Sequence, residues 1–158
     1  LLSVLYFIYC NEMWNQLDGL TGLLNQSSYL NRTEEMRYSG GVLIVFDVND
    51  DYGHLQGDIC LAAIADCIKK AYACYGYCYR IGGDEFCVLL KNGEKEEECL
   101  HEFMNRLEER RKEITFLPIV SFGSSVFSGE DINVVKEIAD RNMYQCKKEQ
   151  KNRVASQL

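Results

Sequence analysis

Two glycines followed directly by two acids, Gly82-Gly83-Asp84-Glu85, occupy the middle of an apolar and aromatic stretch at residues 79–90. The flanking residues predict two short strands, and a glycine pair between strands is typical of a tight hairpin turn with the acids at the start of the outgoing strand. Glycines leave bare backbone against which a bulky group can lie. Because side chains alternate along a strand, one acid can face a ligand while the other lies at its rim. Such an arrangement suits a phosphate beside a metal-binding acid, although an ordinary hairpin with solvated acids has the same letters.

A third acid, Asp47, ends the apolar run at residues 42–48, as expected of a buried central strand. It is either a ligand at the strand tip or a simple strand-end cap. The polar, glycine-containing segment 49–58 follows and leads into a helical pattern. Its amide and acids either cap that helix or read a guanine base, because a carboxylate pairs with N1 and N2 and an amide pairs with O6 or N3.

The remaining pattern predicts strands alternating with helices around the hairpin, which indicates a sheet with helices packed on its faces. The expected strands lie near 41–48, 77–81, 85–91 and 118–127, and the expected helices near 25–37, 56–73, 94–111 and 131–148.

The segments Asp18–Asn25, the strand ending at Asp47 and Gly82–Phe86 stand in the order found in GGDEF domains, and the chain resembles such a domain of the diguanylate cyclase family. The resemblance covers about residue 18 to the C-terminus, so we expect a linker helix at 1–17 and the domain at 18–158. It implies an α/β (α+β) fold of the ferredoxin-like, polymerase-palm type, with a β-hairpin carrying the motif. The matching segments are Asp18-Gly19-Leu20-Thr21-Gly22-Leu23-Leu24-Asn25, the strand ending at Asp47, Asn49-Asp50, Gly53-His54, Gly57-Asp58, Gly82–Phe86, Val120-Ser121-Phe122-Gly123, Ala139-Asp140 through Tyr144, Lys147-Lys148 and Asn152-Arg153.

The resemblance implies that two GTP molecules condense to cyclic di-GMP with release of pyrophosphate, in a homodimer. The alternative is a catalytically inactive GTP-binding or dimerising module that regulates an attached domain. The cofactor implied is Mg²⁺ or Mn²⁺, held by Asp47, Asp84 and the carbonyl of Val48. Glu85 then serves as a further metal ligand or as the base that deprotonates the hydroxyl, and both roles stay open.

Carried over residue by residue, the resemblance also names a substrate site and a structural ion pair. Asp18 is expected to pair with Arg80 and so to fix the linker helix. The late lysines have a second explanation, because cations suit the C-terminal end of a helix. The expected substrate-binding residues are Asn49 and Asp58 for guanine, Gly82 and Gly83 at the turn, and Lys147 and Lys151 for the terminal phosphates.

The chain departs from the family pattern in two places. Between Val48 and Gly53 it lacks several residues, including a lysine that contacts phosphate in the family. Asn49 could therefore match the family residue on either side of this gap. We expect that a loop is missing from the sequence as given, rather than that the protein has a short connection here. The family's RxxD product-inhibition site corresponds to Ala73-Cys74-Tyr75-Gly76, so we expect no such site.

Composition sets further bounds on partners and compartment. The chain has 158 residues and a net charge of −7, which argues against a nucleic-acid partner. Its eight cysteines lie mostly in predicted strands and helices and indicate a reducing compartment. The apolar residues 1–9 are expected to be a linker helix, the remnant of a membrane helix, or a helix packed on its own domain. An upstream sensor or membrane domain, and a cytoplasmic location in a bacterial protein, are therefore expected.

Overall fold

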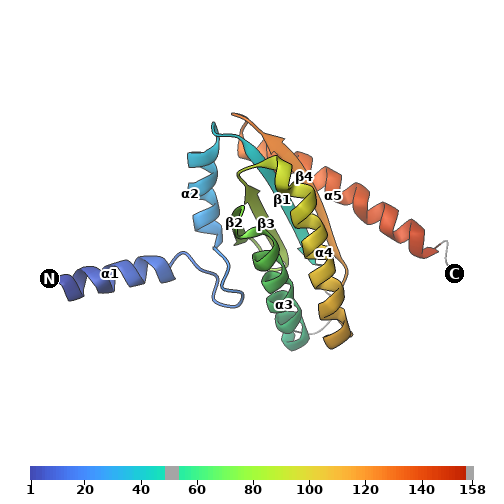
Figure 1. Ribbon diagram of the computed structural model, residues 1–158, viewed down its shortest axis with the longest axis horizontal. Coiled ribbons are helices and arrows are strands. Elements are labelled where there is room, and N and C mark those ends of the chain that lie inside the picture. The colour runs from blue at the N-terminus through green and yellow to red at the C-terminus, as the bar shows by residue number, and fades with distance from the viewer. Residues whose placement is uncertain (49–53, 156–158) are drawn as a thin grey trace.

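The computed structural model describes residues 1–48 and 54–155, with five α-helices, a short 3₁₀ helix and four strands among them (Figure 1). The predicted strands and the helices between them are confirmed, with ends that differ by a few residues. The last helix continues to Ala155 instead of ending near residue 148. In chain order the elements are α1 (Leu2–Trp14), α2 (Gln26–Met36), β1 (Gly41–Val48), α3 (His54–Tyr72), β2 (Gly76–Arg80), β3 (Glu85–Leu90), η1 (Gly93–Lys95), α4 (Glu96–Glu113), β4 (Val120–Phe127) and α5 (Ile132–Ala155).

The four strands form one sheet in the order β2-β3-β1-β4, and every neighbouring pair is antiparallel. Strands β1 and β2 are separated by β3, and β3 and β4 are separated by β1, which is the split βαβ arrangement of ferredoxin-like folds. The predicted fold class is therefore confirmed.

Helices cover both faces of this sheet, so β1 reads as a continuous apolar run rather than an alternating one. Its side chains still alternate between two cores. The even-numbered residues Val42, Ile44, Phe46 and Val48 pack with residues of α3 and α4, including Ile64 and Phe103. The odd-numbered Leu43 and Val45 pack with Tyr29 of α2 and with Val135 and Ala139 of α5.

Helix α5 lies directly on the backbone of β4 because Gly123 has no side chain. A Cβ at this position would lie 2.3 Å from both the Ala139 carbonyl oxygen and the Met143 nitrogen. Any side chain here would push the helix away from the sheet. Gly123 therefore sets the distance between β4 and the helix that carries Lys147.

Helix α1 points away from the sheet (Figure 1) and has no buried residue. Of the three alternatives for residues 1–9, packing on the domain is not what the structure describes. Its end is tied to the start of α2 by Asn25, whose side-chain amide donates to the Asn15 carbonyl at 2.6 Å and whose backbone N–H donates to Gln16 at 2.8 Å. Among the described helices, none combines the length and the hydropathy that a membrane crossing requires.

Candidate functional site

The glycine-acid motif forms the tip of the β2–β3 hairpin. Residues 81–84 connect the strands, and the N–H groups of Ile81 and Gly82 donate to the Glu85 carbonyl at 3.0 and 3.3 Å. Gly82, Gly83 and Asp84 are exposed at this tip. The two acids do not both begin the outgoing strand as expected: Asp84 lies in the turn, and Glu85 is the first strand residue.

The structure brings Asp47 and Glu85 together. They lie directly opposite each other in the β1–β3 ladder, and their side chains therefore share one face of the sheet. By the alternation of β1 this is the face covered by α5. Asp84 reaches the same strand end through its backbone, because its carbonyl accepts the N–H of Val48 at 3.0 Å.

Two lysines of α5 contact these facing acids. The Lys147 ammonium forms a hydrogen-bonded ion pair with the Asp47 carboxylate. Lys136 lies 2.6 Å from Glu85 and 3.1 Å from Asp140. Burial alone would lower the pKa of Lys136, but its hydrogen bonds to both carboxylates outweigh burial and raise the pKa above its usual value. Like charges placed opposite each other on neighbouring strands repel, so the lysines stabilise the acid pair.

Arg80 connects the hairpin tip to the segment that follows α1. Its guanidinium donates to both oxygens of Asp18 at 3.2 Å, and it also donates to the Gly83 carbonyl at 2.7 and 3.2 Å. The expected Asp18–Arg80 pair is confirmed. Burial tends to raise the pKa of Asp18, but hydrogen bonds from Thr21 and Arg80 outweigh it, so the pKa is lowered.

The other expected substrate residues are not gathered at this site by the described contacts. Asp58 is exposed in the first turns of α3. Asn49 and the segment after Val48, where the chain departs from the family pattern, lie outside the described residues. Lys151 belongs to α5, and its side chain also lies outside the described part of the chain.

Sequence reasoning did not identify Lys136. A signal was available in the spacing along α5. Asp140 lies about one helical turn after Lys136, and Lys147 lies about three turns after Lys136, so the three side chains share one face of the helix. The sequence does not show which strand this helix face contacts, because nothing in it indicates that α5 approaches β3.

The acid pair is suited to a divalent cation bound together with substrate phosphates. Mg²⁺ takes few protein carboxylates and completes its shell with water and phosphate oxygens. Within residues 1–48 and 54–155 no group of three or more acidic, histidine or cysteine side chains is arranged to hold a metal by itself. Asp47 and Glu85 each already carry one ammonium partner, so the site tolerates positive charge at this place.

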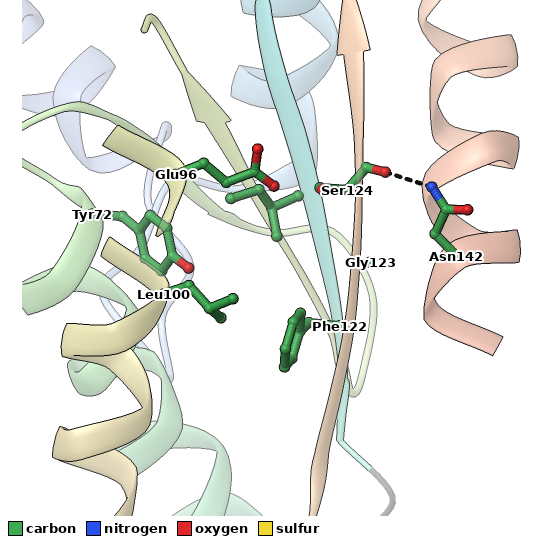
Figure 2. A pocket seen from close by; sticks show the side chains of 8 residues that line it. Tyr72, Glu96, Leu100, Phe122, Gly123, Ser124 and Asn142 are labelled. Atoms are coloured by element: carbon green, nitrogen blue, oxygen red, sulfur yellow. Dashed lines mark hydrogen bonds between the residues drawn. The ribbon is translucent and has the colours of Figure 1, made fainter. Parts of the chain in front are cut away.

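A separate pocket of about 250 Å³ lies beside the edge strand β4. It is on the opposite face of the sheet from Asp47 and Glu85, the face to which Ile44 points. Figure 2 shows Tyr72 and Leu100 on one side and Phe122 on the other. At its far rim Asn142 donates to the Ser124 carbonyl at 2.8 Å. None of the residues that line this pocket belongs to the cluster of Asp47, Glu85, Lys136, Asp140 and Lys147, so the pocket is not part of the candidate site.

Comparisons with curated proteins find diguanylate cyclases. The probable diguanylate cyclase DgcI of Escherichia coli K12 is 31% identical over 153 residues, which is 87% of this chain and 33% of that protein. Diguanylate cyclase DgcZ of the same organism is 30% identical over 164 residues, which is 94% of this chain and 55% of that protein. The chain thus spans about a third to a half of these relatives.

Solved structures show the same fold. The coiled coil and GGDEF domain of DgcB from Caulobacter crescentus, solved with c-di-GMP, matches with a TM-score of 0.77 at 22% identity, covering 93% of this chain and 88% of that one. The diguanylate cyclase SiaD from Pseudomonas aeruginosa, solved with its activator SiaC, matches with a TM-score of 0.76 at 23% identity, covering 93% and 64%. The family model described as "Diguanylate cyclase, GGDEF domain" matches residues 15–153. With that match across most of its length, the chain belongs to the GGDEF domain family.

Proposed function

We propose that this domain is an active diguanylate cyclase that joins two GTP molecules into cyclic di-GMP and releases two pyrophosphates. The observation that carries the proposal is the facing pair Asp47 and Glu85, with Asp84 beside it and Lys147 above it. A phosphoryl-transfer site needs acids for a metal, cations for the leaving phosphates and open backbone near them. The described residues supply each of these at one end of the sheet.

The work of the chain's own residues follows from their charges. Asp47 and the hairpin acids provide the negative charge that would hold Mg²⁺ or Mn²⁺, which when bound lowers the pKa of the 3′-hydroxyl and screens the α-phosphate. The side-chain-free Gly82 and Gly83 leave room for phosphates at the exposed tip. Lys147 is paired with Asp47 in the free protein. When GTP binds, the Lys147 ammonium would exchange Asp47 for the terminal phosphates as its ion-pair partner.

The ring of cyclic di-GMP contains two nucleotides, whereas each domain offers one acid pair. We therefore propose that two protomers bring their sites together, each with one GTP. The isolated domain should pair only at high concentration. In a longer protein, attached segments that dimerise would hold two domains together and so raise their effective concentration.

The test is incubation of the purified domain with GTP and Mg²⁺ over a range of protein concentrations, followed by chromatography for cyclic di-GMP. Product that rises more steeply than linearly with protein is expected. Asp84→Asn and Asp47→Asn should each lower the rate by about two orders of magnitude or more while leaving the fold intact. GTP binding without any product at high protein concentration would favour the regulatory, non-catalytic alternative.

We also propose that the product does not inhibit this cyclase through an RxxD site. Ala73 and Gly76 occupy the charged positions of that motif and cannot form charged hydrogen bonds. A Cβ at Gly76 would lie 2.2 Å from the Leu89 carbonyl oxygen, so this backbone leaves no room for the aspartate. Initial rates should stay nearly constant on addition of micromolar cyclic di-GMP. Inhibition that persists with saturating GTP would contradict the proposal.

A further inference from the structure

The contact of Lys136 with Glu85 has a role that the family motifs do not assign. Lys136 leaves α5 one turn before Asp140 and reaches Glu85 on β3, with 2.6 Å between ammonium and carboxylate. Its side chain is 28% exposed and that of Glu85 is 31% exposed, so both ions are partly withdrawn from water. An ion pair in such a place orients its partners more strongly than one on the open surface does.

The position of Glu85 places its carboxylate next to a like charge. It is the first residue of β3, and its opposite neighbour Asp47 carries the same charge. Repulsion between the two would turn Glu85 away from the site. Lys136 removes that repulsion, and Asp140 in turn holds Lys136 at 3.1 Å through a contact between successive turns of the same helix.

We infer that Lys136 is a positioning residue for Glu85 and competes with the metal for it. In the metal-free protein its ammonium occupies Glu85 and neutralises one of the two facing acids. A divalent cation bound at Asp47 and Glu85 has to share Glu85 with Lys136. The lysine therefore stabilises the empty site and weakens metal binding, while keeping Glu85 beside Asp47. This inference rests on the proposed metal site, but its tests need neither GTP nor turnover.

The first test is Mn²⁺ binding to the intact chain, measured by electron paramagnetic resonance or calorimetry without nucleotide. Lys136→Met should bind Mn²⁺ about fivefold more tightly, which is the factor expected for loss of one partly exposed charge next to a ligand. Lys136→Arg keeps the charge and should bind as the original chain does. Lys112→Met, an exposed lysine on α4, is the matched control and should leave Mn²⁺ affinity unchanged.

The second test is a double-mutant cycle with Glu85→Gln. If Lys136 acts through Glu85, Lys136→Met should not change Mn²⁺ affinity further once Glu85 is neutral. In EDTA, Lys136→Met should lower the melting temperature by several degrees, and this loss should also be smaller in the Glu85→Gln background.

A purely structural ion pair gives a different pattern, in which Lys136→Met lowers the melting temperature but leaves Mn²⁺ affinity unchanged. That result would overturn the inference, as would an equal change of affinity in both backgrounds. Absence of Mn²⁺ binding by the original chain and by Lys136→Met would also overturn it. Cyclase activity is measured separately, so an inactive domain that nevertheless shows the Mn²⁺ pattern would refute the proposed function and leave this inference standing.

Discussion

The contact between Gly123 and α5 predicts a large effect of a single methyl group. Gly123→Ala places a Cβ 2.3 Å from two backbone atoms of α5, whereas ordinary contacts begin near 3.4 Å. Backbone atoms of a helix cannot rotate aside, so α5 has to move by roughly 1 Å. Overpacking of this kind costs about 3 kcal/mol, the upper end of its usual range. For a chain of this size, that lowers the melting temperature by about 6–12 °C.

Circular dichroism melts and urea titrations of purified Gly123→Ala would measure this loss. Gly19→Ala is the matched control, because a Cβ at Gly19 meets nothing within 4 Å, and its stability should stay within about 0.5 kcal/mol of the original. If Gly123→Ala melts within about 2 °C of the original chain, α5 does not lie on β4 as described. A folded Gly123→Ala should also show weakened ion pairs of α5 with the acid pair, which Mn²⁺ affinity would report.

Three further predictions concern the hairpin support, acid stability and thiols. Arg80→Lys replaces a planar fork with a point charge, so it should cost about 1–2 kcal/mol in urea unfolding and lower cyclic di-GMP formation; equal stability would contradict a bridging role. The lowered pKa of Asp18 adds stability that is complete above its unfolded value of 3.8 and is lost as pH falls through the lower folded value. The difference in unfolding free energy between the original chain and Asp18→Asn should therefore be full at about pH 6 and narrow below about pH 4. In a Thr21→Val background this difference should be smaller at about pH 6, where Asp18 is ionised. Exposed Cys74 should react with a thiol reagent at neutral pH, whereas Cys87, whose thiol pKa is raised by burial, should react only on unfolding.

The sequence predicted strand β1, which carries Asp47 near its end, because helices bury β1 on both faces and its residues form an apolar run. It also predicted the hairpin, because glycine pairs between strands are specific turn signals. It could not decide which hairpin acid faces Asp47, since a shift of one residue in the register moves every side chain to the other face. The observed register gives this place to Glu85 and leaves Asp84 in the turn.

The role of Lys136 could not be predicted for a related reason. Lysines spaced along a helix usually lie on a solvated face, and the sequence does not show which strand a helix face will meet. Here the approach of α5 to the sheet depends on the missing side chain of Gly123, and the partner of Lys136 depends on the β1–β3 register. The contact partner of Lys136 can therefore be assigned only when both the packing of α5 on the sheet and the β1–β3 register are known.

The forked contact of Arg80 gives the hairpin tip a direct mechanical link to the N-terminal helix. Asn25 joins the end of α1 to α2, Asp18 lies in the short segment between these helices, and Arg80 connects Asp18 to the Gly83 carbonyl. A twist or shift of α1 would therefore reach the backbone of the hairpin tip through a few hydrogen bonds, without repacking either core. Helix α1 has no buried residue of its own, so neither hydrophobic core opposes such a movement.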